Sequence, residues 1–244
     1  MRILGVIPAR YASKRFPGKV LALLGGEPVL VHVIRRAQAA KRLSGVVVAT
    51  DDRRIAEVAE KFCPVVMTDS ELPSGTDRVA AAIRGIECDA VVNIQGDEPM
   101  MAAEVIDAVA EALQDADMTT AATPIRSEED LQNPNVVKVV CTLSGRALYF
   151  SRYPIPYCRD ADTGYDLKRF FYLRHIGIYG YRRETLFRLV QWPPSALEQM
   201  ERLEQLRALE HDVMIRVCKV EWSGIGIDVP EDLERAEAAL RKQS

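Results

Sequence analysis

A basic loop, residues 8–19, follows the first apolar run of the chain. It contains four cationic side chains and no acidic one, namely Arg10, Lys14, Arg15 and Lys19. Gly18 and the small residues Ala12 and Ser13 would let backbone N–H groups approach a ligand closely. These features suit a loop that holds the phosphates of a nucleoside triphosphate. A solvated surface loop is the alternative, and neither a Walker A loop nor a dinucleotide fingerprint is present.

Two aspartates lie in loops beside predicted strands: Asp97 comes just after one, and Asp228 comes after a late strand and just before a helix. Attack on the α-phosphate of a nucleoside triphosphate builds negative charge that magnesium can offset, and magnesium prefers one or two carboxylates plus phosphate oxygens. The pair is therefore a candidate magnesium site. Either aspartate could instead cap a turn or helix, although Pro99 and Pro230 would place the caps at Glu98 and Val229.

The elements that must position these residues follow from the hydrophobic pattern. Short apolar runs alternate with amphipathic segments, which predicts a doubly wound α/β fold with a mainly parallel sheet and helices on both faces. Strands are predicted at Ile3–Ile7, Val46–Ala49, Pro64–Met67, Ala90–Ile94 and Met118–Thr123. Helical spacing of apolar residues predicts core-facing helices at 29–40 and 103–113. In such folds ligands bind at the carboxyl ends of the strands, so the basic loop and both aspartates should meet there.

The regularity weakens after about residue 124. Strands are predicted at Val136–Cys141, Ala147–Phe150, Arg174–Tyr181 and Val213–Val220, and helices at Ser195–Glu210 and Pro230–Lys242. We expect one domain spanning residues 1–244, with substrate specificity and subunit contacts in its second half.

Composition excludes several classes of protein. The 244 residues have a net charge of −3, which gives no reason to expect nucleic acid as a partner. No apolar run approaches the ~20 residues of a membrane span, and the N-terminal apolar run is too short for a signal peptide. The five cysteines are scattered, which predicts neither a disulfide framework nor a zinc site. We expect a cytoplasmic protein.

The basic loop resembles the corresponding loop of the 3-deoxy-manno-octulosonate cytidylyltransferases, also called CMP-Kdo synthetases, at Ile7–Ser13 and Phe16–Lys19. Further similar segments recur in order and cover essentially the whole chain: Val48–Asp52, Ser74–Arg78, Asn93–Pro99, Asn133–Val140, Tyr149–Arg152, Arg174–Tyr181, Leu203–Arg207 and Gly226–Leu233.

The resemblance implies a Rossmann-like fold of the nucleotide-diphospho-sugar transferase type, with a smaller inserted region for substrate binding and dimerisation at roughly 125–185. It implies the reaction of CTP with 3-deoxy-D-manno-octulosonate (Kdo) to give CMP-Kdo and diphosphate, for lipopolysaccharide biosynthesis. It also implies a homodimer and Mg²⁺, held by Asp97 and Asp228.

Site residues are carried over from the resemblance position by position. Catalytic roles fall on Arg10, Lys19, Asp97 and Asp228. Nucleotide contacts fall on Arg10, Ala12, Ser13, Lys19, Ser74, Gly75, Arg78 and Gln95. Sugar contacts fall on Gln95, Arg159, His175, Tyr179, Glu204 and Gln205. The residues taken alone allow simpler roles: Ser74 or Thr76 as a helix cap, His175 as a core histidine, and Glu204 and Gln205 as a polar helix face.

The implied chemistry is in-line attack of the anomeric 2-hydroxyl of Kdo on the α-phosphorus of CTP, driven by positioning and charge stabilisation. A close rival substrate is 8-amino-8-deoxy-Kdo, which would leave every similar segment intact. A CMP-sialic acid synthetase is a second rival, but such enzymes typically have Gly-Gly-Ser where this chain has Tyr11-Ala12-Ser13. A non-catalytic nucleotide-binding subunit is a third. The chain departs from the family pattern mainly at 160–171, which we expect to lie near a subunit interface.

Overall fold

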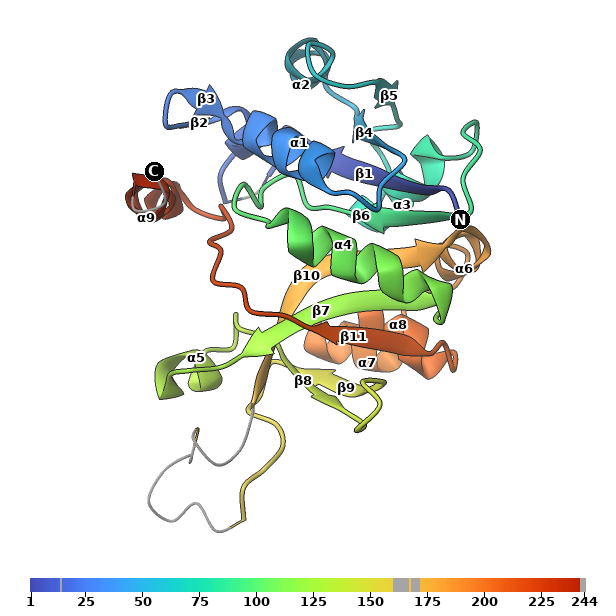
Figure 1. The fold of residues 1–244 in the computed structure, drawn as a ribbon, viewed down its shortest axis with the longest axis vertical. Helices are drawn as coiled ribbons and strands as arrows, with labels where there is room; N and C mark the ends of the chain where they lie inside the picture. The colour runs from blue at the N-terminus through green and yellow to red at the C-terminus, as the bar shows by residue number, and fades with distance from the viewer. Residues whose placement is uncertain (14, 160–166, 168–171, 242–244) are drawn as a thin grey trace.

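The structure is a computed structural model that describes residues 1–13, 15–159, 167 and 172–241 (Figure 1). Its main sheet has the strand order β11-β7-β10-β6-β1-β4-β5, and β8 and β9 extend it beside β10. The strands are β1 (Ile3–Ala9), β4 (Gly45–Thr50), β5 (Val65–Met67), β6 (Ala90–Asn93), β7 (Met118–Pro124), β8 (Lys138–Cys141), β9 (Ala147–Ser151), β10 (Leu173–Arg182) and β11 (Ile215–Lys219). A separate small hairpin joins β2 (Leu23–Leu24) to β3 (Glu27–Pro28).

Helices cover both faces of the sheet. The α-helices are α1 (Val29–Ala39), α2 (Arg53–Ala59), α3 (Gly75–Ala82), α4 (Ala103–Glu111), α5 (Glu128–Gln132), α6 (Arg183–Leu189), α7 (Ala196–Glu201), α8 (Gln205–Glu210) and α9 (Pro230–Arg241). Helices α1 and α4 lie together on one face, while α3, α6 and α8 lie on the other (Figure 1). The alternation along β1 explains this: Ile3 and Ile7 join the first core, and Leu4 and Val6 join the second.

Strand β10 runs against its neighbours. It pairs antiparallel with β6, β7 and β8, whereas β1 pairs parallel with β4 and β6, β4 with β5, and β7 with β11. The prediction of a mainly parallel, doubly wound sheet is confirmed for the central path. Because β10 is reversed, its first residues, and not its last, lie at the sheet edge where β6 and β7 end.

Most predicted elements are present, with ends shifted by a few residues. The predicted helix Ser195–Glu210 is wrong as one element, because Arg202 adopts a left-handed conformation (φ 56°) that ends α7 before α8 begins. Helices α2, α5 and α6 and the β2–β3 hairpin were not predicted. Of the stretch 160–171, only Leu167 is described, so the expectation for it lies outside the described residues. In the described part of the chain, no helix is long and apolar enough to cross a membrane.

Candidate active site

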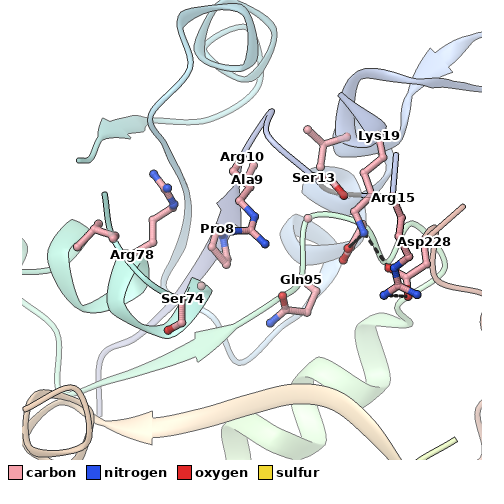
Figure 2. Close-up of a pocket in the computed structure, with 15 residues that line it drawn as sticks. Pro8, Ala9, Arg10, Ser13, Arg15, Lys19, Ser74, Arg78, Gln95 and Asp228 are labelled. Atoms are coloured by element: carbon pink, nitrogen blue, oxygen red, sulfur yellow. Dashed lines mark hydrogen bonds and ion pairs between the residues drawn. The ribbon is translucent and has the colours of Figure 1, made fainter. Parts of the chain in front are cut away.

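A cavity of about 410 Å³ opens at the carboxyl end of β1 (Figure 2). Its walls come from the end of β1, the basic loop, the start of α3, the turn after β6 and the segment before α9. The polar residues that line it are Arg10, Ser13, Arg15, Lys19, Ser74, Arg78, Gln95, Asp97 and Asp228. The structure thus brings both aspartates and most of the nucleotide residues into one cavity, at the edge where the topology predicted a site.

Lys19 joins the two aspartates. Its Nζ contacts Oδ2 of Asp97 and lies 3.0 Å from Oδ1 of Asp228. Arg15 lies 3.3 Å from the other oxygen of Asp228, and Figure 2 shows Arg15 and Lys19 converging on Asp228. Burial by itself would lower the pKa of Lys19, but the Asp97 and Asp228 carboxylates outweigh it and raise the pKa above its usual value.

The spacing of the two carboxylates bears on whether a divalent cation could bind between them. The Lys19 ammonium contacts both carboxylates, so Asp97 and Asp228 are close enough to bind one cation together. Among the described residues no group of three or more His, Cys, Asp and Glu is arranged to hold a metal. Two carboxylates suit magnesium, which usually keeps water and phosphate oxygens as its remaining ligands. The two carboxylates of Asp97 and Asp228 are therefore chemically compatible with magnesium.

The backbone around the aspartates explains their orientation. The Ile227 N–H donates to the Asp97 carbonyl at 2.8 Å, which ties the turn after β6 to the segment before α9. The side chain of Asp232 accepts from the backbone N–H groups of Asp228 and Val229 at 2.8 and 3.0 Å. Asp228 is thus no helix cap, and its carboxylate is free to face the cavity. Asp97 is no helix cap either, because α4 begins only at Ala103.

Glu98 lies behind the aspartate pair, and sequence reasoning gave it no role beyond a cap. Burial, and then the Asp97 charge, raise the pKa of Glu98 to about 8. Its Oε2 is buried and has no hydrogen-bond partner within the described part of the chain. A Cβ on Gly226 would lie 2.6 Å from Glu98 Oε1, so a glycine at 226 lets the Asp228 segment pass over this carboxyl group.

The start of α3 forms the opposite wall. The Ser74 hydroxyl caps the helix by accepting from the Asp77 N–H at 3.1 Å, so the cap prediction is confirmed, and Ser74 also lines the cavity. Arg78 is only 3% exposed and its guanidinium lies 3.2 Å from a carboxylate oxygen of Asp51. This pairing fixes the Arg78 side chain along the wall. The side-chain amide of Gln95 donates to Asn93 Oδ1 at 3.3 Å, which orients the Gln95 side chain.

Four of the residues predicted for the sugar lie on β10 or at the start of α8, outside the lining of the cavity, namely His175, Tyr179, Glu204 and Gln205. His175 Nε2 and Thr120 Oγ1 are 2.9 Å apart, and the imidazole packs edge-on against Phe150 and beside Tyr179. Burial, together with the neighbouring Arg174 charge, lowers the pKa of His175 to about 3. The imidazole is therefore neutral at physiological pH. Burial also raises the pKa of the Tyr179 phenol, which stays protonated.

A hydrogen bond connects α8 to α3. Thr76, buried in the first turn of α3, donates its hydroxyl to Oε1 of Glu204. Burial raises the pKa of Glu204 despite this bond. The neighbouring Gln205 is 4% exposed, and its amide Nε2 has no hydrogen-bond partner among the described residues. A buried amide donor left free is costly in a folded protein unless a ligand or water completes it. Thr76 was considered in the sequence only as a cap, and nothing local signalled its bond to a residue 128 positions away.

Some predicted residues stand apart from the cavity. Ala12 is exposed and does not line it. Arg159 is also exposed and does not line it; it directly precedes a stretch outside the described residues. Arg15, which the sequence placed only in the basic loop, does line it and contacts Asp228.

Comparison with known proteins agrees with this geometry. Residues 4–215 match the model of a family described as cytidylyltransferase. The 3-deoxy-manno-octulosonate cytidylyltransferase of Bdellovibrio bacteriovorus is 48% identical over 248 residues, which cover 100% of this chain and 99% of the relative. The enzyme of the same name from Thermodesulfovibrio yellowstonii is 46% identical over 98% of both chains.

Solved structures give the same picture. A CMP:2-keto-3-deoxy-manno-octonic acid synthetase in complex with CTP superposes with a TM-score of 0.93 at 38% identity, over 100% of both chains. A 4-diphosphocytidyl-2C-methyl-D-erythritol synthase from Anaerococcus prevotii reaches a TM-score of 0.66 at 13% identity, which shows a shared fold alone.

Proposed function

Because this chain belongs to the 3-deoxy-manno-octulosonate cytidylyltransferase family, we propose that it transfers CMP from CTP to Kdo and releases diphosphate. The observation that carries the proposal is the contact of Lys19 with both Asp97 and Asp228 inside a cavity bordered by the basic loop. Cationic side chains for a triphosphate and two carboxylates for a metal are the groups that nucleotidyl transfer needs.

The nucleotide would lie along the cavity. Arg10, Ser13, Arg15 and Lys19 approach from the basic loop and suit the phosphates, whereas the start of α3 suits the nucleoside. The proposed nucleoside contacts are Ser74, Gly75, Arg78 and Gln95. Their main-chain and side-chain polar groups are fixed before a ligand arrives, because Ser74 caps α3 and Arg78 is held by Asp51.

The sugar would lie beside Gln95, toward β10 and α8. Gln205 Nε2 supplies a free buried donor for a hydroxyl group, and Glu204 supplies a carboxyl group held by Thr76. His175 and Tyr179 complete this side as neutral hydrogen-bonding groups. Arg159 remains a proposed contact for the sugar carboxylate, for which guanidinium groups are well suited.

Magnesium would be held by Asp97 and Asp228, and when bound it would offset the negative charge that builds on the α-phosphate. The proposed reaction is an in-line displacement in which the anomeric 2-hydroxyl of Kdo attacks the α-phosphorus and diphosphate leaves toward the basic loop. Lys19 and Arg15 would stabilise the departing diphosphate. No covalent intermediate is required, because positioning and charge stabilisation supply most of the rate.

A sugar panel tests the substrate. Purified protein with CTP and magnesium is given Kdo, 8-amino-8-deoxy-Kdo or a sialic acid, and diphosphate release is followed. We expect the highest kcat/KM with Kdo. Turnover with another acidic sugar and none with Kdo would contradict the substrate while leaving nucleotidyl transfer intact.

We also propose a homodimer in the cytoplasm that supplies CMP-Kdo for lipopolysaccharide biosynthesis. Exposed apolar side chains gather on the β8–β9 hairpin and the segment after it, namely Leu143, Leu148, Tyr153 and Tyr157. Such residues are typical of a subunit contact, and a two-fold dimer is the commonest arrangement. Light scattering should give a dimer mass that Leu148→Asp reduces to that of a monomer. Leu23→Asp, at an exposed leucine of the β2–β3 hairpin, is the matched control and should remain dimeric.

A further inference from the structure

The carbonyl of Tyr11 closes the basic loop on itself. It accepts hydrogen bonds from the backbone N–H of Ser13 at 2.9 Å and from that of Gly18 at 2.8 Å. The Tyr11 carbonyl therefore links the middle of the loop, at Ser13, to its end, at Gly18. Tyr11 comes directly after Arg10. Any shift of Tyr11 would move Arg10 at one end of the loop and Lys19 at the other.

The ring of Tyr11 also packs against Gly18. A Cβ at Gly18 would lie 2.9 Å from the ring atom Cε2, and Gly18 has a left-handed φ of +73°. A side chain at 18 is thus excluded by the ring as well as by the backbone conformation. Because Lys19 follows Gly18 directly, the ring fixes the point from which the Lys19 side chain reaches Asp97 and Asp228.

The outer face of the same ring carries a guanidinium group. The guanidinium carbon of Arg54 lies 3.4 Å from the centre of the Tyr11 ring. Arg54 is itself held by Asp52, through Nε to Oδ1 at 2.9 Å and the terminal nitrogen to Oδ2 at 2.6 Å. Asp52 caps α2 by accepting from the Arg54 N–H. Neither Arg54 nor Asp52 lines the cavity.

We propose that Tyr11 is a positioning residue for the phosphate-binding loop, and that Arg54 and Asp52 act through it as a brace from α2. The loop carries four cationic residues. Asp97 and Asp228 offset the charges of Lys19 and Arg15, but the repulsion that is left favours an open loop unless its two ends are held. A loop that is already closed loses less entropy when the triphosphate binds, which raises affinity without a new contact. The inference rests on the proposed function for the identity of the nucleotide.

The experiment measures the Kd for CTP by titration calorimetry and, separately, the kinetic constants. Tyr11→Leu should weaken CTP binding about tenfold, because the aromatic face and its packing on Gly18 are lost. Tyr11→Phe keeps the ring and should stay within about twofold of the original. Arg54→Ala should weaken binding about threefold, and Arg54→Lys should resemble it because a lysine provides no planar stack. In each weakened variant the KM for CTP should rise more than kcat falls.

Arg53→Ala is the matched control, since it removes the same charge from the neighbouring exposed position of α2. If Arg54 acts only by attracting the anionic nucleotide, the two alanine variants will weaken CTP binding equally, and the proposed brace is wrong.

A double variant tests whether Arg54 acts through Tyr11. In the Tyr11→Leu background, Arg54→Ala should cause no further increase in the Kd for CTP, whereas additive effects would contradict action through Tyr11. If Tyr11→Leu does not fold, the Kd values for CTP of Arg54→Ala, Arg53→Ala and Arg54→Lys still test the brace. An original chain that does not bind CTP contradicts the proposed function, while normal CTP binding by the Tyr11 and Arg54 variants contradicts the brace alone.

Discussion

The ammonium of Lys19 lies 3.0 Å from a carboxylate oxygen of Asp228, although 209 positions separate them in the chain. The same ammonium contacts Asp97, which follows the central strand β6. One side chain from the first loop therefore joins carboxylates supplied by the middle and the end of the chain. The site therefore depends on contacts between segments that lie far apart in the chain.

Replacing either carboxylate by an amide should remove activity and leave the fold. We expect Asp97→Asn and Asp228→Asn each to lower kcat by at least about 100-fold, because a preorganised charge at the reacting phosphate is lost. Diphosphate release across a magnesium titration measures the effect, and circular dichroism checks folding. Asp115→Asn, at an exposed site outside the cavity, is the control. Near-normal turnover at low magnesium in either variant would remove that residue from the metal site.

Gln205 should show a separation between stability and function. Its buried Nε2 has no protein partner among the described residues, so Gln205→Met, of similar volume, should cost less than about 1 kcal/mol of unfolding free energy. The KM for Kdo should nevertheless rise about tenfold, as expected when a hydrogen bond to the sugar is lost, while the KM for CTP stays constant. Urea unfolding and steady-state kinetics measure the two effects. A large loss of stability with an unchanged KM for Kdo would mean that the amide serves the fold instead.

The hydrogen bond from the Thr76 hydroxyl to Glu204 should contribute to both the stability of the protein and the binding of the sugar. Thr76→Val leaves the buried Glu204 carboxyl group without this donor and should destabilise the protein by about 1–3 kcal/mol. It should also raise the KM for the sugar, because Glu204 loses its anchor on α3. Thr76→Ser keeps the hydroxyl and serves as the control in urea unfolding. Equal stability of the valine and serine variants would show that the contact contributes nothing.

His175 makes stability depend on pH. Its pKa is about 3 in the folded protein and about 6.5 when unfolded, so between these values the unfolded chain binds a proton that the folded chain does not. Its contribution to the unfolding free energy is thus complete above pH 6.5 and is lost as pH falls toward 3. Replacement by asparagine, His175→Asn, should shrink the loss between pH 7 and pH 5 by about 1–2 kcal/mol. An identical pH dependence in urea unfolding of both proteins would show that the imidazole is accessible to protons in the folded state.

The order of strands and loops along the chain was enough to predict several residues of the site. Arg10, Lys19 and Asp97 each follow a buried apolar strand, and parallel strands deliver such residues to one edge of the sheet. Asp228 was placed there by the same rule, and the side chain of Asp232 holds its backbone by accepting from the N–H groups of Asp228 and Val229. These predictions needed no knowledge of distant contacts.

The features that escaped prediction depend on contacts between distant segments. The left-handed Arg202, which separates α7 from α8, has no glycine to signal it. The bond from Thr76 to Glu204 and the stack of Arg54 on Tyr11 join segments whose spatial proximity no local pattern reveals. Likewise, the sequence does not show that Gly226 packs against the Glu98 carboxyl group, where a side chain at position 226 would clash.

The most direct test is the nucleotide product itself. Purified protein is incubated with CTP, Kdo and magnesium, and the nucleotides are separated by anion-exchange chromatography with mass detection. We expect one CMP-Kdo for each diphosphate released, and no CMP-Kdo from Asp97→Asn or Asp228→Asn. Unconsumed CTP in the presence of the unaltered protein, or equal CMP-Kdo formation by all three proteins, would contradict it.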